Sequence, residues 1–316
     1  MVSLPIFDWP APISKPRSQI ASIENLKNHQ QLIIKDSSIY LKGGIQKITQ
    51  DLLIPPGYEL HISAGTIIEL TNQSSIVSNG PVFIQGSKDN PVIINGSKGG
   101  QGLAILNAKE KSLIQHTTFL GLKGRNKNGQ ILDGGVTFYQ SDFACTRCVF
   151  ENSQSKDALT IIGSKYKLED VVILNANGDG VDANQSTGEI NNFIAEKIGK
   201  DAVEITGGYL YASGINVNKV FGAALNLTRN GTAELTNNFI IKNSEKGIMA
   251  SDLGKVKVDF LTLEKVAQGI IVYEKLSEYG PAEVNIKDFN AKEIDQLHVL
   301  ESGANLTIKN NRIDVK

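Results

Sequence analysis

The chain repeats itself about every 22 residues, and this repeat constrains the fold more than any other feature of the sequence. Segments such as DGVDA (179–183), DAVEI (201–205) and KGIMA (246–250) align with an aliphatic residue at position 3 and an apolar residue at position 5. Apolar residues at alternate positions indicate a strand. The position-3 residues recur every 22 or 23 residues: Leu159, Val181, Val203, Leu225, Ile248 and Ile270.

The position-3 column extends in both directions along the chain. We expect it to continue through Val136, Leu103, Val82 and Leu60 on one side and to reach Leu297 on the other. Two intervals are longer, 33 residues before Val136 and 27 residues after Ile270. One repeat cannot bury its own apolar face, so the repeats must stack into one cooperative unit. A unit of this length, with three short strands and three turns, predicts one coil of a parallel β-helix.

A second column of residues is suited to sharp bends. It lies about eleven residues before each aliphatic residue and consists of Cys148, Asp170, Asn192, Gly214, Asn238, Asp259, Asp288 and Asn311. Asn, Asp and Gly accept the left-handed backbone conformation that such bends require. We therefore predict an all-β solenoid of ten or eleven coils over residues 33–316. Residues 1–32, with four prolines and the only Trp, are expected to be a cap or linker with a short helix begun by Ser22.

The charge balance excludes several classes of protein. The chain has 32 Lys and Arg against 33 Asp and Glu, which argues against a generic nucleic-acid binder. It has no apolar run of the roughly 18 residues that a membrane span needs. The residues after Met1 have neither the charged nor the apolar region of a signal peptide, so we expect none in this sequence.

The two cysteines, Cys145 and Cys148, are separated by two residues. A pair without a nearby His does not provide the four ligands of a zinc site. Two interpretations remain. The favoured one is that they are small residues in a strand and turn, and the other is a local disulfide.

The chain from about residue 33 resembles the right-handed parallel β-helix proteins of the pectin-lyase-like superfamily. The resemblance rests on the 22-residue coils, on the Asn-rich bends and on the opening coil LIPPGYELHISAGTIIEL (53–70). It implies a right-handed solenoid in which the DAVEI-type strands form the first sheet, whose outer face carries the sugar site. That superfamily includes lyases, hydrolases, epimerases and non-enzymatic binders, so the resemblance indicates a polysaccharide partner without fixing the reaction.

Five carboxylates gather on three successive coils of this predicted first sheet. Position 1 of the repeat holds Asp157, Asp179 and Asp201, and the outward-facing position 4 holds Asp182 and Glu204. Neighbouring coils lie about 4.8 Å apart, so these like charges would repel one another. Three interpretations are open: a solvated acidic patch softened by lysines, a calcium site formed by Asp179, Asp182, Asp201 and Glu204, or catalytic carboxylates.

Part of this segment is similar to the polygalacturonase signature. Asn177-Gly-Asp-Gly-Val-Asp182 matches N-x-D-G-x-D, so Asp179 and Asp201 fall on catalytic positions, and Asp157 is added as a third candidate. The rest of the signature departs from the family. Lys200 replaces an aspartate, Phe221-Gly-Ala-Ala replaces the G-H-G segment, and Met249-Ala-Ser replaces R-x-K. The sequence therefore does not predict a polygalacturonase.

The two long intervals place additional candidates beside the first sheet. Lys123 and Arg125 belong to an inserted loop and are expected to meet an anionic sugar. Lys246 stands at position 1 two coils beyond Asp201. Tyr139 and Tyr273 stand at position 6 and are expected to stack on sugar rings. With Asp182 and Glu204, these five residues form the predicted substrate-binding set.

Two functional hypotheses follow. The first is a lyase or hydrolase that acts on an acidic polysaccharide through the first-sheet carboxylates, with calcium as the one candidate cofactor. The second is a non-catalytic carbohydrate-binding protein or an assembly scaffold of the envelope or cell surface. Under either hypothesis we expect a secreted, periplasmic or cell-surface protein.

Overall fold

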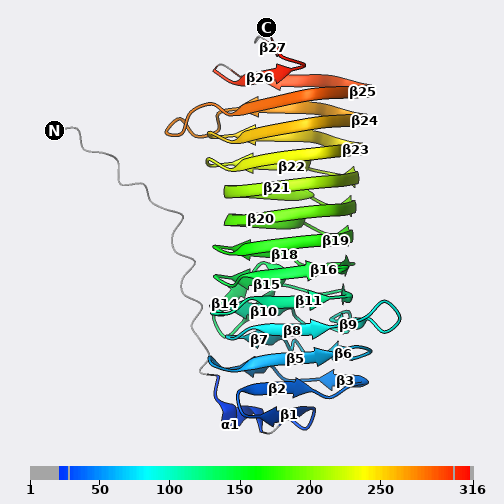
Figure 1. The fold of residues 1–316 in the computed structure, drawn as a ribbon, viewed down its shortest axis with the longest axis vertical. Coiled ribbons are helices and arrows are strands. Elements are labelled where there is room, and N and C mark those ends of the chain that lie inside the picture. The colour runs from blue at the N-terminus through cyan, green and yellow to red at the C-terminus, as the bar shows by residue number, and fades with distance from the viewer. Residues whose placement is uncertain (1–20, 28, 302, 314–316) are drawn as a thin grey trace, which may run out of the picture.

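The computed structural model describes residues 21–27, 29–301 and 303–313, and it confirms the predicted solenoid. Parallel strands stack coil upon coil along one axis, with the N-terminal coils at one end and the C-terminal coils at the other (Figure 1). The solenoid has about 12 turns with a spacing of about 23 residues, slightly more turns than expected. Residues 1–20 of the expected cap lie outside the described residues.

Three parallel sheets form the walls of the solenoid. The first sheet begins with β4 (Leu52–Ile54), β7 (Ile76–Ser78), β10 (Leu103–Leu106), β15 (Gly134–Tyr139) and β18 (Asp157–Ile162). The second begins with β2 (Ser38–Leu41), β5 (Glu59–Ser63), β8 (Val82–Gln85), β11 (Ser112–Gln115) and β16 (Phe143–Thr146). The third begins with β3 (Ile45–Ile48), β6 (Ile67–Leu70), β9 (Val92–Asn95), β12 (Thr117–Leu120) and β17 (Val149–Glu151).

In the later coils the strands run on through the corners and serve more than one sheet. They are β19 (Lys165–Ala176), β20 (Asp179–Ile198), β21 (Val203–Val220), β22 (Ala223–Thr228), β23 (Thr232–Ser251), β24 (Lys255–Tyr273) and β25 (Glu283–Leu300). A hairpin, β13 (Arg125–Lys127) with β14 (Gln130–Leu132), lies apart from these sheets, and β26 (Asn305–Ile308) with β27 (Asn311–Ile313) follows β25.

The aliphatic column is real, but its ends differ from the prediction. From Leu103 to Ile270 each position-3 residue pairs with the next, and all are buried. Below Leu103 the column passes to Ile76 of β7, because Val82 belongs to the second sheet. Leu60, predicted further down the same column, is the neighbour of Val82 there, and Leu52 takes its place below Ile76. Spacing alone cannot separate sheets when every strand is apolar at alternate positions.

At the upper end the register reaches His298 instead of the predicted Leu297. Ile270 pairs with His298, whereas Leu297 keeps 37% of its surface exposed. The longer loop before β25 shifts the register by one residue, and a shift of one residue exchanges the two faces of a strand.

The corners follow three columns of left-handed residues. The predicted column is correct at Asp170, Asn192 and Gly214, but the preceding bend falls on Arg147 and the following one on Asn237. Cys148, Asn238, Asp259, Asp288 and Asn311 are not left-handed, so the prediction is wrong there. Two further columns were not predicted. One runs through Gln140, Gly163, Gln185, Gly207 and Arg229, and the other through Asn152, Asn175, Lys197, Lys219, Asn243, Lys265 and Glu293.

A short helix, α1 (Ile23–Leu26), lies at the N-terminal end of the solenoid (Figure 1). The Ser22 hydroxyl accepts a hydrogen bond from the Asn25 amide, as its predicted capping role requires, but the helix is shorter than residues 22–30 allowed. Leu26 is buried against the core, and the first described strand, β1 (Leu32–Lys35), pairs with β2. No helix within the described ranges has the length and apolar character needed to cross a membrane.

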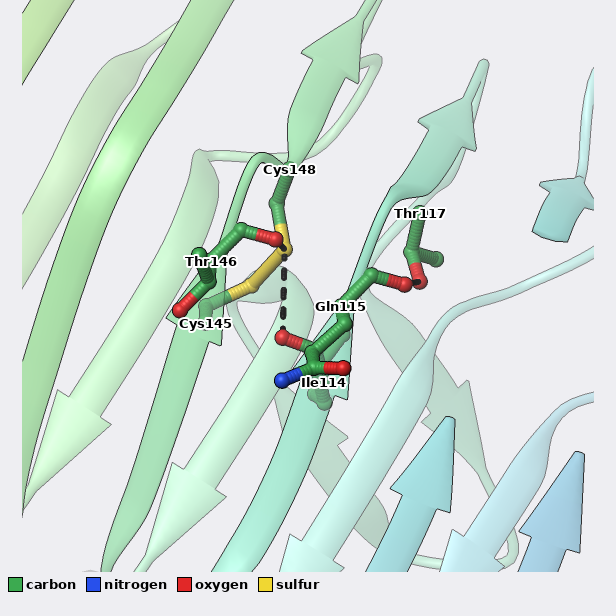
Figure 2. Close-up of a disulfide and its surroundings, with 6 residues drawn as sticks. All are labelled: Ile114, Gln115, Thr117, Cys145, Thr146 and Cys148. Atoms are coloured by element: carbon green, nitrogen blue, oxygen red, sulfur yellow. Dashed lines mark hydrogen bonds between the residues drawn. A yellow bond between two sulfur atoms is a disulfide. The ribbon is translucent and has the colours of Figure 1, made fainter. Parts of the chain in front are cut away.

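The favoured interpretation of the cysteines is wrong, because Cys145 and Cys148 form a disulfide. The bridge spans the corner between β16 and β17, and the Cys148 sulfur faces the Ile114 carbonyl oxygen of the preceding coil (Figure 2). Both cysteines are buried in the core. A bridge across a bend in the core holds two sheets of one coil together, and disulfides of this kind form in oxidising compartments.

Reduction of this bridge tests its contribution to stability. We expect the double variant Cys145→Ser, Cys148→Ser to lose about 2 kcal/mol or less, because the bridge closes a very short loop. Thermal unfolding, with and without reductant, measures the change. A free-thiol titration is the control. Two reactive thiols in the native, unreduced protein would contradict the assignment.

Candidate functional site

The five carboxylates come together on β18, on β20, and on β21 with the residues just before it, as the repeat predicted. Asp157 pairs with Asp179, and Asp182 pairs with Glu204 on the next coil. We call Asp157, Asp179 and Asp201 the inner row and Asp182 with Glu204 the outer pair. The inner row is buried, whereas both members of the outer pair are half-buried.

Two members of the inner row, Asp179 and Asp201, are bonded to the backbone of the following coil. Asp179 Oδ1 accepts a hydrogen bond from the Asp201 amide at 2.7 Å, and Asp201 Oδ1 accepts one from the Ala223 amide at 2.6 Å. Asp201 Oδ2 accepts a further bond, at 2.9 Å, from the Asn226 side chain. The inner row is therefore not a solvated acidic patch. The carboxylates of Asp179 and Asp201 accept hydrogen bonds from backbone amides at the edge of the sheet, where the hydrogen-bonded strand ladder is interrupted.

Asp157 stands at the lower end of the inner row and differs from the other two members. Its Oδ2 accepts a hydrogen bond from the Thr160 hydroxyl at 2.8 Å, whereas its buried Oδ1 has no partner in the structure. Burial raises the pKa of Asp157, and burial likewise raises that of Asp201. A raised carboxyl pKa favours the protonated form. A buried carboxyl oxygen that accepts no hydrogen bond favours the protonated form as well.

Lys200 joins the inner row to the outer pair. Its ammonium lies 2.8 Å from Asp179 Oδ2 and 2.9 Å from Glu204 Oε2. Burial alone would lower the pKa of Lys200, but the bonds to Asp179 and Glu204 outweigh that effect and raise it. The lysine that departs from the polygalacturonase pattern is thus the positive centre of this cluster.

The predicted calcium site does not fit these residues. Ligand oxygens of Asp179, Asp201 and Glu204 do lie within 4.8 Å of one another. Asp179 and Glu204 already share the Lys200 ammonium, and Asp201 accepts hydrogen bonds from Ala223 and Asn226. A calcium ion would have to displace both sets of bonds, and calcium takes at least six oxygen ligands.

The outer pair places two carboxyl groups of different character side by side. Burial, reinforced by the charges of Asp157, Glu204 and Asp179, raises the pKa of Asp182 to about 8. Asp182 also accepts a hydrogen bond from Asn184 at 2.9 Å. Glu204 instead contacts the Lys200 ammonium at 2.9 Å. The Cα atoms of Asp182 and Glu204 are in register on neighbouring coils and therefore lie one strand spacing apart, about 4.8 Å.

The inserted loop does not present its arginine to solvent. Arg125 is 2% exposed and bonds Asp51, Ser75 and Gln130, which fixes the β13–β14 hairpin to the lower coils. Its expected role in meeting a sugar is corrected to a structural one, because the loop folds into a hairpin on the sheet. Lys123 remains exposed. No pattern in the sequence indicates the buried ion-pair partner, Asp51, which lies 74 residues away.

The two tyrosines flank the carboxylates from opposite ends. Tyr139 packs against a small cluster that includes Leu132 of the hairpin. Tyr273 pairs with Ser251 and is half-buried, and burial raises its pKa. Lys246 pairs with Ala223 at position 1, where the repeat placed it.

One buried aspartate near Tyr273 was missed. Asp252 Oδ1 accepts bonds from the amides of Lys275 and Leu276, both at 2.8 Å, and Thr228 donates to its other oxygen. Asp252 therefore fixes the start of the loop 274–282 beside the first sheet. Its left-handed conformation is typical of Asp at a turn, which was the available signal in the sequence.

Comparison with known proteins supports the architecture. The family described as "Right handed beta helix region" matches residues 157–313, which include all five carboxylates and the coils above them. This match confirms the predicted handedness. No curated protein sequence matches the chain.

Solved structures show a likeness of fold alone, at low identity. A GH87 α-1,3-glucanase catalytic domain in complex with nigerose is 11% identical with a TM-score of 0.42, covering 82% of this chain and 68% of that one. The catalytic unit of a thermostable GH87 α-1,3-glucanase from Streptomyces thermodiastaticus is 15% identical with a TM-score of 0.39, covering 81% and 62%. Tailspike protein 3 of bacteriophage CBA120 is 12% identical with a TM-score of 0.38, covering 85% and 56%.

The raised pKa of Asp182 predicts how stability depends on pH. Between the unfolded pKa near 4 and the folded pKa of about 8, the native state binds more protons than the unfolded state. The free energy of unfolding should therefore fall as the pH rises from about 5 to about 9. Asp182→Asn should reduce this fall and stabilise the protein by about 1–3 kcal/mol at the alkaline end.

Urea unfolding at a series of pH values measures this dependence. Asp259→Asn is the matched control, because Asp259 is an exposed aspartate of β24 remote from the cluster. A steeper decline in Asp182→Asn than in the wild type would show that the carboxyl is not protonated in the folded state.

Proposed function

We propose that this chain, which belongs to the right-handed parallel β-helix proteins, binds a polysaccharide along the outer face of its first sheet and hydrolyses a glycosidic bond with the outer pair. The observation that carries the proposal is the contrast between Asp182, whose pKa is raised to about 8, and Glu204, which is paired with Lys200. A carboxyl group with a raised pKa, beside a second carboxyl group that contacts a cation, is an arrangement that glycoside hydrolases use.

The proposed reaction assigns one role to each member of the outer pair. Asp182 donates its proton to the glycosidic oxygen while Glu204 attacks the anomeric carbon, so that the glycosidic bond breaks as a glycosyl ester forms. Asp182, now a carboxylate, then takes a proton from a water molecule that attacks the anomeric carbon, so that the bond from this carbon to Glu204 breaks and Glu204 leaves as a carboxylate. The Cα atoms of the pair lie one strand spacing apart, and carboxyl groups about 5 Å apart are typical of retaining enzymes, so we expect retention of configuration.

The inner row supports this pair and does not itself touch the sugar. Asp179 and Asp201, the residues first predicted to be catalytic, are 1% and 4% exposed, and their oxygens are engaged. Asp179 holds the Lys200 ammonium that in turn contacts Glu204. Asp179 and Asp201 are therefore positioning residues in this proposal.

A non-catalytic carbohydrate-binding or surface-scaffold role is the second candidate. The backbone bonds of Asp179 and Asp201 favour it, because they show that much of the acidic cluster stabilises the coils. The two candidates differ in one respect. A binder retains its polysaccharide unchanged, whereas a hydrolase generates new reducing ends and a lyase generates unsaturated ends.

Substitution of the outer pair tests the proposed reaction. On a panel of neutral and acidic polysaccharides, Asp182→Asn should lower kcat by about 10²- to 10⁴-fold, the usual contribution of a general acid. Glu204→Gln should abolish turnover. Release of reducing ends is the readout, with Glu189→Gln on the second sheet as the matched control. The wild-type rate should also decline as the pH rises through about 8, where Asp182 loses its proton.

Two results would contradict the proposal. Cleavage at the wild-type rate by both variants would remove the outer pair from the reaction. Tight binding without cleavage of any polymer by the wild type would favour the non-catalytic candidate.

A further inference from the structure

An open groove of about 890 Å³ lies at the corner where the third sheet ends and the first sheet begins. Its lining comes from five successive coils, from the end of β20 to β25. Four strand spacings separate the first of these coils from the last, so the groove is about 19 Å long. At its lower end it opens three residues before Lys200, and it therefore borders the proposed catalytic face.

Three lysines of this groove have a left-handed backbone conformation, which is unfavourable for lysine. Lys197, Lys219 and Lys265 all have left-handed φ angles, of 58°, 58° and 55°. In the lower coils the same corner column is formed by Asn152 and Asn175, residues that accept this conformation at less cost. A lysine at such a position costs about 1 kcal/mol, and strain of this kind recurs at functional sites.

The two lower lysines make no ion pair with any described residue, and the Glu245 carboxylate lies on the coil above Lys219. Lys197 is in register with Lys219 because their flanking residues pair, so the two Cα atoms lie about 4.8 Å apart. Neither side chain makes an ion pair or hydrogen bond with any residue that the structure describes. Lys265, by contrast, lies 4.0 Å from Glu293. The lower end of the groove therefore presents two adjacent free ammonium groups.

The middle of the groove is open and combines apolar side chains with the exposed carboxylate of Glu245. Val220, Val266 and Ala267 line it, and Phe221 beside them keeps 71% of its surface exposed. The upper end carries Glu293 and Asp295, whose oxygens can accept hydrogen bonds from hydroxyl groups. An aromatic ring with apolar neighbours and polar groups at both ends suits a sugar chain, whose rings have apolar faces and polar edges.

We infer that this groove binds an anionic segment of the polysaccharide, with a carboxylate or sulfate group held by Lys197 and Lys219 and a sugar ring against Phe221. The inference rests on the proposed function, because it extends the bound chain from the first sheet into the corner groove. It identifies the substrate as an anionic polymer on the evidence of the groove alone. The ammonium groups also determine at which end of the groove the anionic group binds, because the acidic end would repel it.

The double variant Lys197→Asn, Lys219→Asn tests the inference. Asn removes both charges and fits the left-handed corner, so the melting temperature should be unchanged or higher. The dissociation constant for oligogalacturonate or dextran sulfate should rise at least tenfold, and the wild-type affinity should fall as salt is added. Neutral dextran should show no difference between the two proteins. Comparing oligogalacturonate with dextran sulfate identifies the anionic group.

The matched control is Lys167→Asn, Lys257→Asn, which removes two lysines of the second sheet and leaves the net charge equal to that of the test variant. It should bind like the wild type. Calorimetry that finds equal affinity in the test variant and the wild type, or no binding of either anionic probe to the wild type, overturns the inference.

This result is independent of the catalytic one. If the lysine variant binds the anionic probes as tightly as the wild type, the proposed groove site is refuted, regardless of the activity of Asp182→Asn. The hydrolase proposal is refuted by full activity of the outer-pair variants whatever the lysine variant binds. A Phe221→Ala variant gives a second measure. It should weaken the binding of both anionic probes, and unchanged affinity would remove the ring from the site.

Discussion

The hydrogen-bonded register between coils is the constraint on which the rest of the structure depends. Each strand lies about 4.8 Å from the same strand of the next coil, so a residue type repeated in sequence becomes a column in space. From Leu103 to Ile270 this produces a continuous buried stack. The same rule stacks left-handed corners, and it places Asp157 beside Asp179 and Asp182 beside Glu204.

Stacking also explains how the solenoid tolerates so much acid in one place. Like charges in register repel one another, and here hydrogen bonds, an ion pair and protonation offset this repulsion. Asp179 and Asp201 accept backbone hydrogen bonds, and Lys200 bridges Asp179 and Glu204. Burial, together with the charges of Asp157, Glu204 and Asp179, raises the pKa of Asp182, so this carboxyl keeps its proton. The chemical asymmetry of the outer pair is a consequence of that distribution.

The sequence predicted those features that repeat, and it failed where the chain departs from the repeat. The parallel coils, the central aliphatic stack and the gathering of five carboxylates followed from spacing alone. The change from Leu297 to His298 followed from a loop of irregular length, and Val82 was assigned to the wrong sheet because all three sheets share the same alternation. Arg125 and the Cys145–Cys148 bridge depend on contacts in three dimensions, as do the roles of Asp179 and Asp201. No count along the chain reveals which carboxyl is buried against a backbone amide.

The central claim is that a polysaccharide lies across the outer pair and continues into the corner groove. A crystal structure of the Asp182→Asn variant soaked with an oligogalacturonate tests it most directly. The account predicts a glycosidic oxygen within hydrogen-bonding distance of residue 182, an anomeric carbon facing Glu204, and a sugar carboxylate between Lys197 and Lys219. A sugar bound on the second or third sheet, with the first sheet bare, would contradict it.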